Sequence, residues 1–263
     1  MLHRDSMGTK QTYGAERRHG GNVAQWLVAG AGMLHEEMWD VNGKEDGLVS
    51  KQELFQLWVN LPSDFKMTRP RLSLLNNNNN NDNGNGNGND DDVQVPIPIV
   101  EGVGTKTNIL VGKYESFESQ VETFSPMSIL HVQMEPGSTW SMNVPRSYKT
   151  GIVYMRQGSG FLGESKSELE SELVEAHHTA TLTPYGEELT LKAGKDGADF
   201  MLLAGEPLYE PVQAQGSMVM NTEQEIGVAY DDYSRGKMGL PWDHKLSDEE
   251  WTDHVRKAPN VYR

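Results

Sequence analysis

The sequence predicts an all-β protein with minor C-terminal helices, and two patterns carry this prediction. Beyond residue 106, short apolar segments ended by Gly or Pro recur about every ten residues. These segments are MSILHVQMEPG, KTGIVYMRQGSGFLG, HHTATLTPYGEELTLKAG and ADFMLLAGEPL. Clear helix-start signals come late, where TEQE (222–225) and SDEE (247–250) match the capping box. Short strands with this punctuation are typical of an all-β barrel or sandwich.

Two further strands are expected before residue 75. NVAQWLVAGAGML predicts a strand that runs into a Gly-containing turn. ELFQLWVNLP alternates, with Phe55, Leu57, Val59 and Leu61 on one face, which predicts a half-buried strand. Farther along, ESKSELESELVEA could form a helix, but an acidic insertion between strands is the preferred interpretation. GVGTK (102–106) is too short for a phosphate-binding loop.

A low-complexity stretch, NNNNNNDNGNGNGNDDD at residues 76–92, interrupts the strand pattern. It has no apolar side chain, so burial cannot offset the entropy lost on ordering it. We therefore predict a disordered Asn/Gly/Asp-rich linker over residues 76–106. The linker separates an N-terminal domain (1–75) from a C-terminal domain (107–221), which is followed by a helical tail (222–263).

Composition narrows the functional classes. The formal net charge of −15 disfavours non-specific binding to nucleic acid or to an anionic membrane, because both partners are negatively charged. The chain has no Cys, which excludes disulfides, thiolate metal ligands and a Cys nucleophile, and is consistent with a reducing nucleus or cytoplasm. No apolar run reaches the roughly 18 residues of a membrane span, and the start of the chain lacks the apolar segment of a signal peptide.

The stretch AGAGMLHEEM offers a candidate metal site at His35 and Glu37. Side chains alternate along a strand, so residues two apart share a face, whereas on a helix they do not. The strand interpretation pairs His35 with Glu37 and leaves Glu36 outward. An imidazole and a carboxylate suit iron(II), manganese, nickel or zinc, but a non-heme iron centre needs at least three protein ligands. A hydrogen-bonded pair at a strand end is the alternative.

Other metal patterns in the sequence are weaker. NGKEDGLVSKQE (42–53) matches part of a calcium loop, but Lys44 stands where a ligand oxygen is needed. His177 and His178 are adjacent, so on a strand they would lie on opposite faces. His131 alternates with apolar neighbours and is expected on a polar face or in a barrel interior. Each of these histidines is expected to be structural.

Several stretches together resemble the pirin family. They are VAQWLVAGAGMLHEEM, LFQLWVNLPSDFKM, HHTATL, AGEPLYEPV and MNTEQEI, which occur in the pirin order and cover most of the chain outside the linker and the last twenty or so residues. The resemblance implies a bicupin, with two jelly-roll β-barrels and a C-terminal helix. It implies iron in the N-terminal barrel, held by three histidines and a glutamate.

Carried onto this chain, the resemblance makes His35 and Glu37 metal ligands, with Glu37 also as the catalytic residue. The family's first two histidines belong to an HPHRGFE-like motif that would lie before Met1, and His3 matches a later histidine that is not a ligand. The cofactor is therefore expected to be Fe2+ with two ligands absent from this chain, and the first cupin to be incomplete. Trp140 and Met142, in a C-terminal cupin without metal, are expected to be packing residues.

The resemblance leaves three functions open. One is a quercetin 2,3-dioxygenase-like oxidoreductase acting on a flavonol-like molecule. Another is a nuclear transcription co-regulator that binds a transcription factor through its acidic surface. The third is an inactive fragment that lacks two metal ligands. We expect a monomer in the nucleus, the cytoplasm or both, with no direct binding of nucleic acid or membrane.

Overall fold

The computed structural model describes residues 2–5, 10–12, 24–38, 53–76, 93–163, 171–183 and 186–239, and scattered positions beyond. For residues 2–5, 10–12, 37–38, 76 and 93–94 the description covers the backbone. The chain divides into two compact units. Unit 1 comprises Met1–Leu74, Asn80–Gln94 and Glu210–Arg263, and unit 2 comprises Leu75–Asn79 and Val95–Tyr209.

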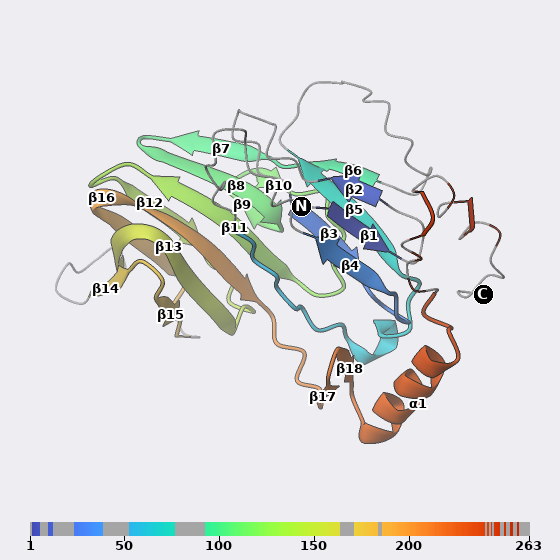
Figure 1. Ribbon diagram of the computed structural model, residues 1–263. Coiled ribbons are helices and arrows are strands. Elements are labelled where there is room, and N and C mark those ends of the chain that lie inside the picture. The colour runs from blue at the N-terminus through green and yellow to red at the C-terminus, as the bar shows by residue number, and fades with distance from the viewer. Residues whose placement is uncertain are drawn as a thin grey trace. The chain divides into compact units, whose positions relative to one another are not determined.

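Unit 2 is built on an antiparallel sheet of eight strands, in the order β14-β13-β16-β11-β8-β7, with β12 paired to β16 and β15 to β13. The long strands β13 and β16 run side by side through it (Figure 1). The strands are β7 (Ile99–Gly102), β8 (Thr105–Val111), β11 (Met127–Met134), β12 (Thr139–Asn143), β13 (Thr150–Gly163), β14 (Glu172–Glu175), β15 (Thr179–Thr181) and β16 (Glu188–Gly205). A small hairpin joins β9 (Lys113–Tyr114) to β10 (Phe117–Glu118).

The core of unit 2 lies on one face of this sheet, as strand alternation requires. On β11, Leu130 and Val132 are fully buried, and on β16 the same holds for Phe200 and Leu202. Trp140 and Met142 of β12 also belong to this cluster, which confirms their predicted role in packing. The strand pattern predicted for the region after residue 106 is therefore confirmed.

Unit 1 contributes shorter elements. Strands β1 (Leu2–Asp5), β2 (Lys10–Thr12) and β4 (His35–Met38) form a three-stranded sheet in the order β2-β1-β4. A second small sheet has the order β3-β5-β6, from β3 (Ala24–Val28), β5 (Arg71–Asn76) and β6 (Val93–Pro96), and the last two residues of β5 and of β6 are assigned to unit 2. The remaining elements are a 3-10 helix at Ser63–Phe65, the hairpin β17 (Gln213–Gln215) with β18 (Met218–Met220), and α1 (Glu223–Ser234).

The predicted capping boxes are present. Thr222 is the N-cap of α1: its hydroxyl accepts from the backbone N–H of Glu225 (3.2 Å), and the Glu225 carboxylate accepts from the N–H of Thr222 (2.8 Å). Ser247 and Glu250 make the same reciprocal pair, at 2.8 and 3.3 Å. The sequence located α1 because its N-terminal signal is local.

Two predictions from the sequence are corrected. Residues 53–62 form no strand, and Leu54, Leu57 and Trp58 are exposed. Residues 93–106, assigned to the linker, instead hold β6 and the hairpin of β7 with β8, because Val95 and Ile97 are apolar enough to be buried. The Asn-rich stretch at 77–92 and nearly all of the calcium-like loop lie outside the described residues.

Acidification is expected to destabilise unit 1 through Glu210. The backbone N–H of Ser63 donates to its carboxylate at 2.8 Å, and the amide of Asn221 donates at 3.0 Å. These hydrogen bonds hold the pKa of Glu210 below its ordinary value, and the bond from the Ser63 backbone has the largest effect. A carboxyl with a depressed folded-state pKa stabilises the fold above its unfolded pKa, and this contribution is lost as the pH falls through the folded value.

Urea unfolding between about pH 6 and pH 2 tests this expectation. The stability difference between the wild-type chain and Glu210→Gln should shrink as the pH falls below about 4.3, the ordinary value for glutamate. A difference that stays constant over the whole range would contradict it.

Candidate metal site and polar clusters

Strand β4 carries both predicted site residues, His35 and Glu37. The strand pairs antiparallel with β1, so that Asp5 lies opposite His35 and His3 opposite Glu37. The extended backbone that the sequence predicted is therefore present, and positions 35 and 37 share a face of the strand. The side chain of Glu37 lies outside the described part of the structure, so its role as a ligand stays a prediction.

A glycine turn fixes the start of β4. Gly30 has φ of +50° and Gly32 of +110°, which side-chain-bearing residues rarely adopt. A Cβ on Gly30 would lie 2.1 Å from the carbonyl oxygen of Thr68. The N–H of Ala31 donates to that carbonyl at 2.9 Å, and the N–H of Leu34 donates to the carbonyl of Met238 at 3.2 Å. The turn therefore delivers His35 at a fixed place within unit 1.

The two faces of β4 differ in their exposure. His35 is exposed, whereas Glu36 is half-buried and its Oε1 atom is shielded from solvent. The expectation that Glu36 points outward is therefore wrong. Alternation was predicted correctly, but which face is covered depends on tertiary packing that the local sequence does not encode.

The residue types at positions 35 and 37 of β4 fit iron(II), but two ligands are too few for an iron site. Imidazole and carboxylate are ligands that non-heme iron takes, and such a centre uses at least three of them. Among the residues whose side chains are described, no group of three His, Cys, Asp or Glu side chains is placed to hold a metal ion. A metal site on β4 would therefore need further donors from positions beyond this strand.

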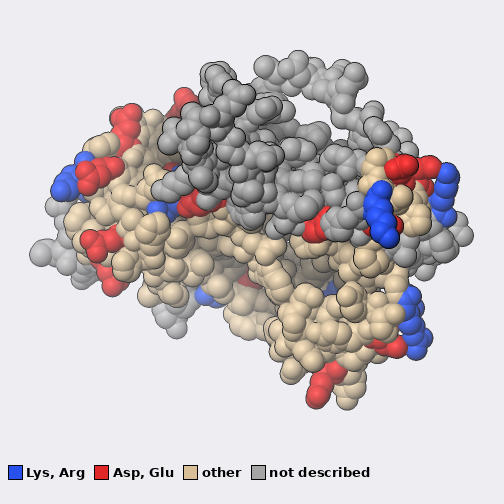
Figure 2. Space-filling view, in the orientation of Figure 1, with Lys and Arg blue, Asp and Glu red and all other residues tan. Residues whose placement is uncertain are grey.

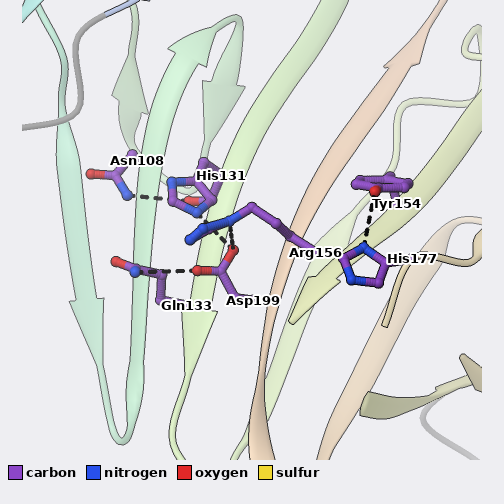
Figure 3. A network of polar contacts seen from close by, with 7 residues as sticks. All are labelled: Asn108, His131, Gln133, Tyr154, Arg156, His177 and Asp199. Carbon is purple, nitrogen blue, oxygen red and sulfur yellow. Dashed lines mark hydrogen bonds and ion pairs between the residues drawn. The ribbon is translucent and has the colours of Figure 1, made fainter. Parts of the chain in front are cut away.

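A polar cluster that the sequence did not reveal lies in unit 2, centred on Asp199 of β16 (Figure 3). Its carboxylate accepts from His131 Nε2 at 2.9 Å, from Arg156 Nε at 3.2 Å and from Gln133 Nε2 at 3.3 Å. The amide of Asn108 donates to the backbone carbonyl of His131 at 3.3 Å. Three donors therefore converge on one buried carboxylate.

This cluster occupies the sheet face opposite the core. His131 and Gln133 alternate on β11 with core residues, as Asp199 does on β16 beside Phe200. His131 therefore lies on a polar face, one of its two predicted places. The signal in the sequence was the polar residue at every second position of otherwise apolar strands. With its carboxylate satisfied by three side-chain donors, the cluster is best explained as a structural ion-pair network.

The other histidines of unit 2 do not form a site. His177 and His178 lie in a turn rather than on a strand, and His177 has φ of +65°. Tyr154 and His177 approach at 3.4 Å between Oη and Nδ1, whereas Nδ1 of His178 lies 3.1 Å from the carbonyl of Ala176 (Figure 3 shows the first pair). The strand assumed for this histidine pair begins only at Thr179, the residue after His178.

Surface charge is mixed on the described part of the chain. On the face drawn in Figure 2, Lys and Arg side chains are separated from one another and lie among Asp and Glu.

Within the described residues, no helix has the length and apolar character needed to cross a membrane.

Comparison with known proteins finds relatives that all belong to one family. Residues 129–239 match the Pirin C-terminal cupin domain. Pirin-1 from Arabidopsis thaliana is 33% identical over 245 residues, which cover 91% of this chain and 72% of that protein. Human Pirin is 29% identical over 228 residues, covering 85% and 69% respectively.

A solved structure extends the similarity to three dimensions. Quercetin 2,3-dioxygenase from Acinetobacter baumannii is 30% identical, with a TM-score of 0.68 over 90% of this chain and 72% of that one. The prediction of an all-β cupin protein with minor helices is confirmed. Because a pirin relative is 33% identical over 91% of this chain and 72% of its own length, and residues 129–239 match the family's C-terminal domain, the chain belongs to the pirin family.

Proposed function

We propose that this chain is an iron-dependent oxidoreductase of the quercetin 2,3-dioxygenase type, acting on a flavonol-like small molecule. The observation that carries the proposal is the similarity to the Acinetobacter baumannii quercetin 2,3-dioxygenase over 90% of the chain. Strand β4 supports it, because it presents an imidazole and a carboxylate position on one face. Both are ligand types for non-heme iron.

In this proposal His35 and Glu37 hold the metal from β4. Bound iron(II) would supply a Lewis acid and a redox-active centre for dioxygen chemistry. The Glu37 carboxylate would act as the general base that takes the proton of a substrate hydroxyl. The side chain of His35 is exposed to solvent, which supports access by a small molecule at this position.

The test measures iron content and quercetin turnover of the purified chain. The apo chain is loaded with ferrous iron under anaerobic conditions, freed of excess metal, and mixed with quercetin and dioxygen. We expect bound iron and oxygen consumption at least about tenfold above the same concentration of free iron, because a positioned base alone contributes about 10²-fold or more. Iron-loaded protein without turnover above free iron would contradict the proposal.

A second candidate is protein binding, as a nuclear transcription co-regulator. The supporting observation is the run of exposed apolar side chains at Leu54, Phe55, Leu57, Trp58 and Val59, since contiguous exposed apolar surface marks interaction sites. The net charge of −15 suits a basic partner face, such as a DNA-binding domain. Pull-down from nuclear extract by the wild-type chain, but not by Trp58→Ser, with quercetin turnover absent, would favour this function.

A further inference from the structure

We propose that Met238, in the turn that follows α1, is a positioning residue for the proposed site: its side chain and its carbonyl hold the glycine turn that leads into His35. The inference rests on the proposed function in taking His35 as a site residue. It goes further in giving the segment after α1 a role in the site, where the sequence predicted only a helical tail.

Two contacts join Met238 to the glycine turn. A Cβ built on Gly32 would lie 2.6 Å from Sδ of Met238, 2.7 Å from its Cγ and 2.8 Å from its Cε. The thioether therefore fills the space where a side chain at Gly32 would stand. The carbonyl of Met238 accepts from the N–H of Leu34 at 3.2 Å. One residue thus holds the chain on both sides of Met33, immediately before His35.

Gly32 and Met238 are complementary in shape. Gly32 has φ of +110°, which residues with a side chain rarely adopt, and its missing Cβ leaves the room that the thioether occupies. Methionine is unbranched and has three rotatable bonds, which suits it to an irregular gap of this kind. Met238 is 5% exposed, so the contact belongs to the interior of unit 1.

The end of α1 fixes the position of Met238. The N–H of Lys237 donates to the carbonyl of Asp232 at 3.0 Å. The N–H of Gly236 donates to the carbonyl of Tyr233, also at 3.0 Å, and Gly236 has φ of +72°. These two bonds make the Schellman motif, which ends a helix and turns the chain away from it. Met238 follows this motif directly, so the helix end determines where its side chain lies.

The contact matters for the proposed site because the turn leads directly into β4. His35 is the first residue of that strand, and its side chain is exposed. Packing restrains an exposed side chain less than a buried one, so the backbone that precedes His35 has more influence on its position. A displacement of about 1 Å at a reacting group can cost about 10²-fold in rate.

The competing explanation is that Met238 only stabilises unit 1, as any buried methionine does. Met238→Ala opens a cavity over Gly32. The matched control, Leu72→Ala, opens a cavity on β5 in the same unit, at a residue that is 3% exposed. Both variants are expected to lose stability, so stability alone does not separate the explanations.

Turnover by the iron-loaded, full-length chain separates them. We expect Met238→Ala, but not Leu72→Ala, to lower kcat for quercetin by about 10- to 100-fold, the usual effect of losing a group that orients a site residue. KM should stay within about twofold, because the substrate itself does not contact the thioether. Met238→Leu keeps the volume of the side chain and should restore kcat to near the wild-type value.

Hydrogen exchange of the metal-free chain gives a readout that does not depend on turnover. If the turn and the helix end open as one unit, the amides of Leu34, Gly236 and Lys237 exchange with the same dependence on denaturant in the wild type. Met238→Ala should speed exchange at Leu34 at least about tenfold more than Leu72→Ala does. Exchange at Leu34 that is independent of the helix end in the wild type would overturn the inference, even if Met238→Ala fails to fold.

The failure of this inference and that of the proposed function give different results. If the wild type turns over quercetin and Met238→Ala does so within about twofold, only the role of Met238 is overturned. An equal loss of kcat in Leu72→Ala would also overturn it. Coupled exchange of Leu34 and the helix end, without quercetin turnover by the wild type, would overturn only the dioxygenase proposal and would support the link between Met238 and the turn.

Discussion

Replacing Trp140 with alanine is expected to lower the free energy of unfolding by about 3 to 5 kcal/mol, the usual cost of truncating a buried aromatic side chain. Trp140 is 2% exposed within the core of unit 2. Its ring stacks on Tyr114 and meets Phe200 edge-on, with centroids 5.4 Å apart in both cases. Truncation removes both ring contacts and leaves a cavity between strands that cannot readily close.

A hydrogen bond adds to the cost. The indole N–H of Trp140 donates to the hydroxyl of Thr107 at 2.9 Å, and Thr107 is itself 1% exposed. Removing the indole leaves that buried hydroxyl without this donor. Conversely, Thr107→Val leaves the indole N–H without its acceptor, which should cost about 1 to 3 kcal/mol.

Urea unfolding followed by far-ultraviolet circular dichroism measures these effects, because the signal does not depend on the tryptophan that is removed. Met142→Leu, on the same strand and in the same core, is a volume-conserving control that should cost less than about 1.5 kcal/mol. A loss below about 1 kcal/mol for Trp140→Ala would show that the core tolerates an empty site at β12, contrary to the packing described.

The sequence predicted the fold where the signals are local. Apolar segments between glycines and prolines located the strands of unit 2, and the Thr222–Glu225 capping box located α1. The alternation at 53–62 failed because a strand forms only where a neighbouring strand supplies hydrogen bonds and packing. Alternation alone says nothing of such a partner, and the described residues 53–62 lie in no sheet.

The candidate site residues also fall into those that a local motif predicts and those that only the fold brings together. The motif at His35 and Glu37 is local, so its strand could be predicted. The Asp199 cluster joins His131 and Asp199, which are 68 residues apart, through the pairing of β11 with β16. Its members become neighbours only when the strand register is known. The opposition of His3 to Glu37 is likewise a property of register rather than of spacing.

The largest functional effect is expected for Glu37→Gln. If Glu37 is the base of the proposed reaction, its amide replacement keeps the size of the side chain but cannot accept the substrate proton. We expect kcat for quercetin to fall by about 10²- to 10⁴-fold, the usual contribution of a positioned general base. Anaerobic iron loading and oxygen consumption, measured on the same samples, separate loss of chemistry from loss of metal.

The matched control is Glu36→Gln, one residue away on the same strand but on the opposite face. It makes the identical chemical change and should leave kcat within about twofold of the wild type, because its carboxylate does not face the proposed site. His35→Ala is expected to lose both iron and turnover, as a ligand would.

These three variants distinguish the possible roles of β4. If Glu37→Gln loses turnover while it retains iron, the carboxylate acts on the proton. If it loses iron in proportion to turnover, the carboxylate acts as a ligand alone and the base must be sought elsewhere. If Glu36→Gln lowers kcat as much as Glu37→Gln, the effect cannot come from the face of His35. The alternating geometry of β4 would then no longer support a site on that face.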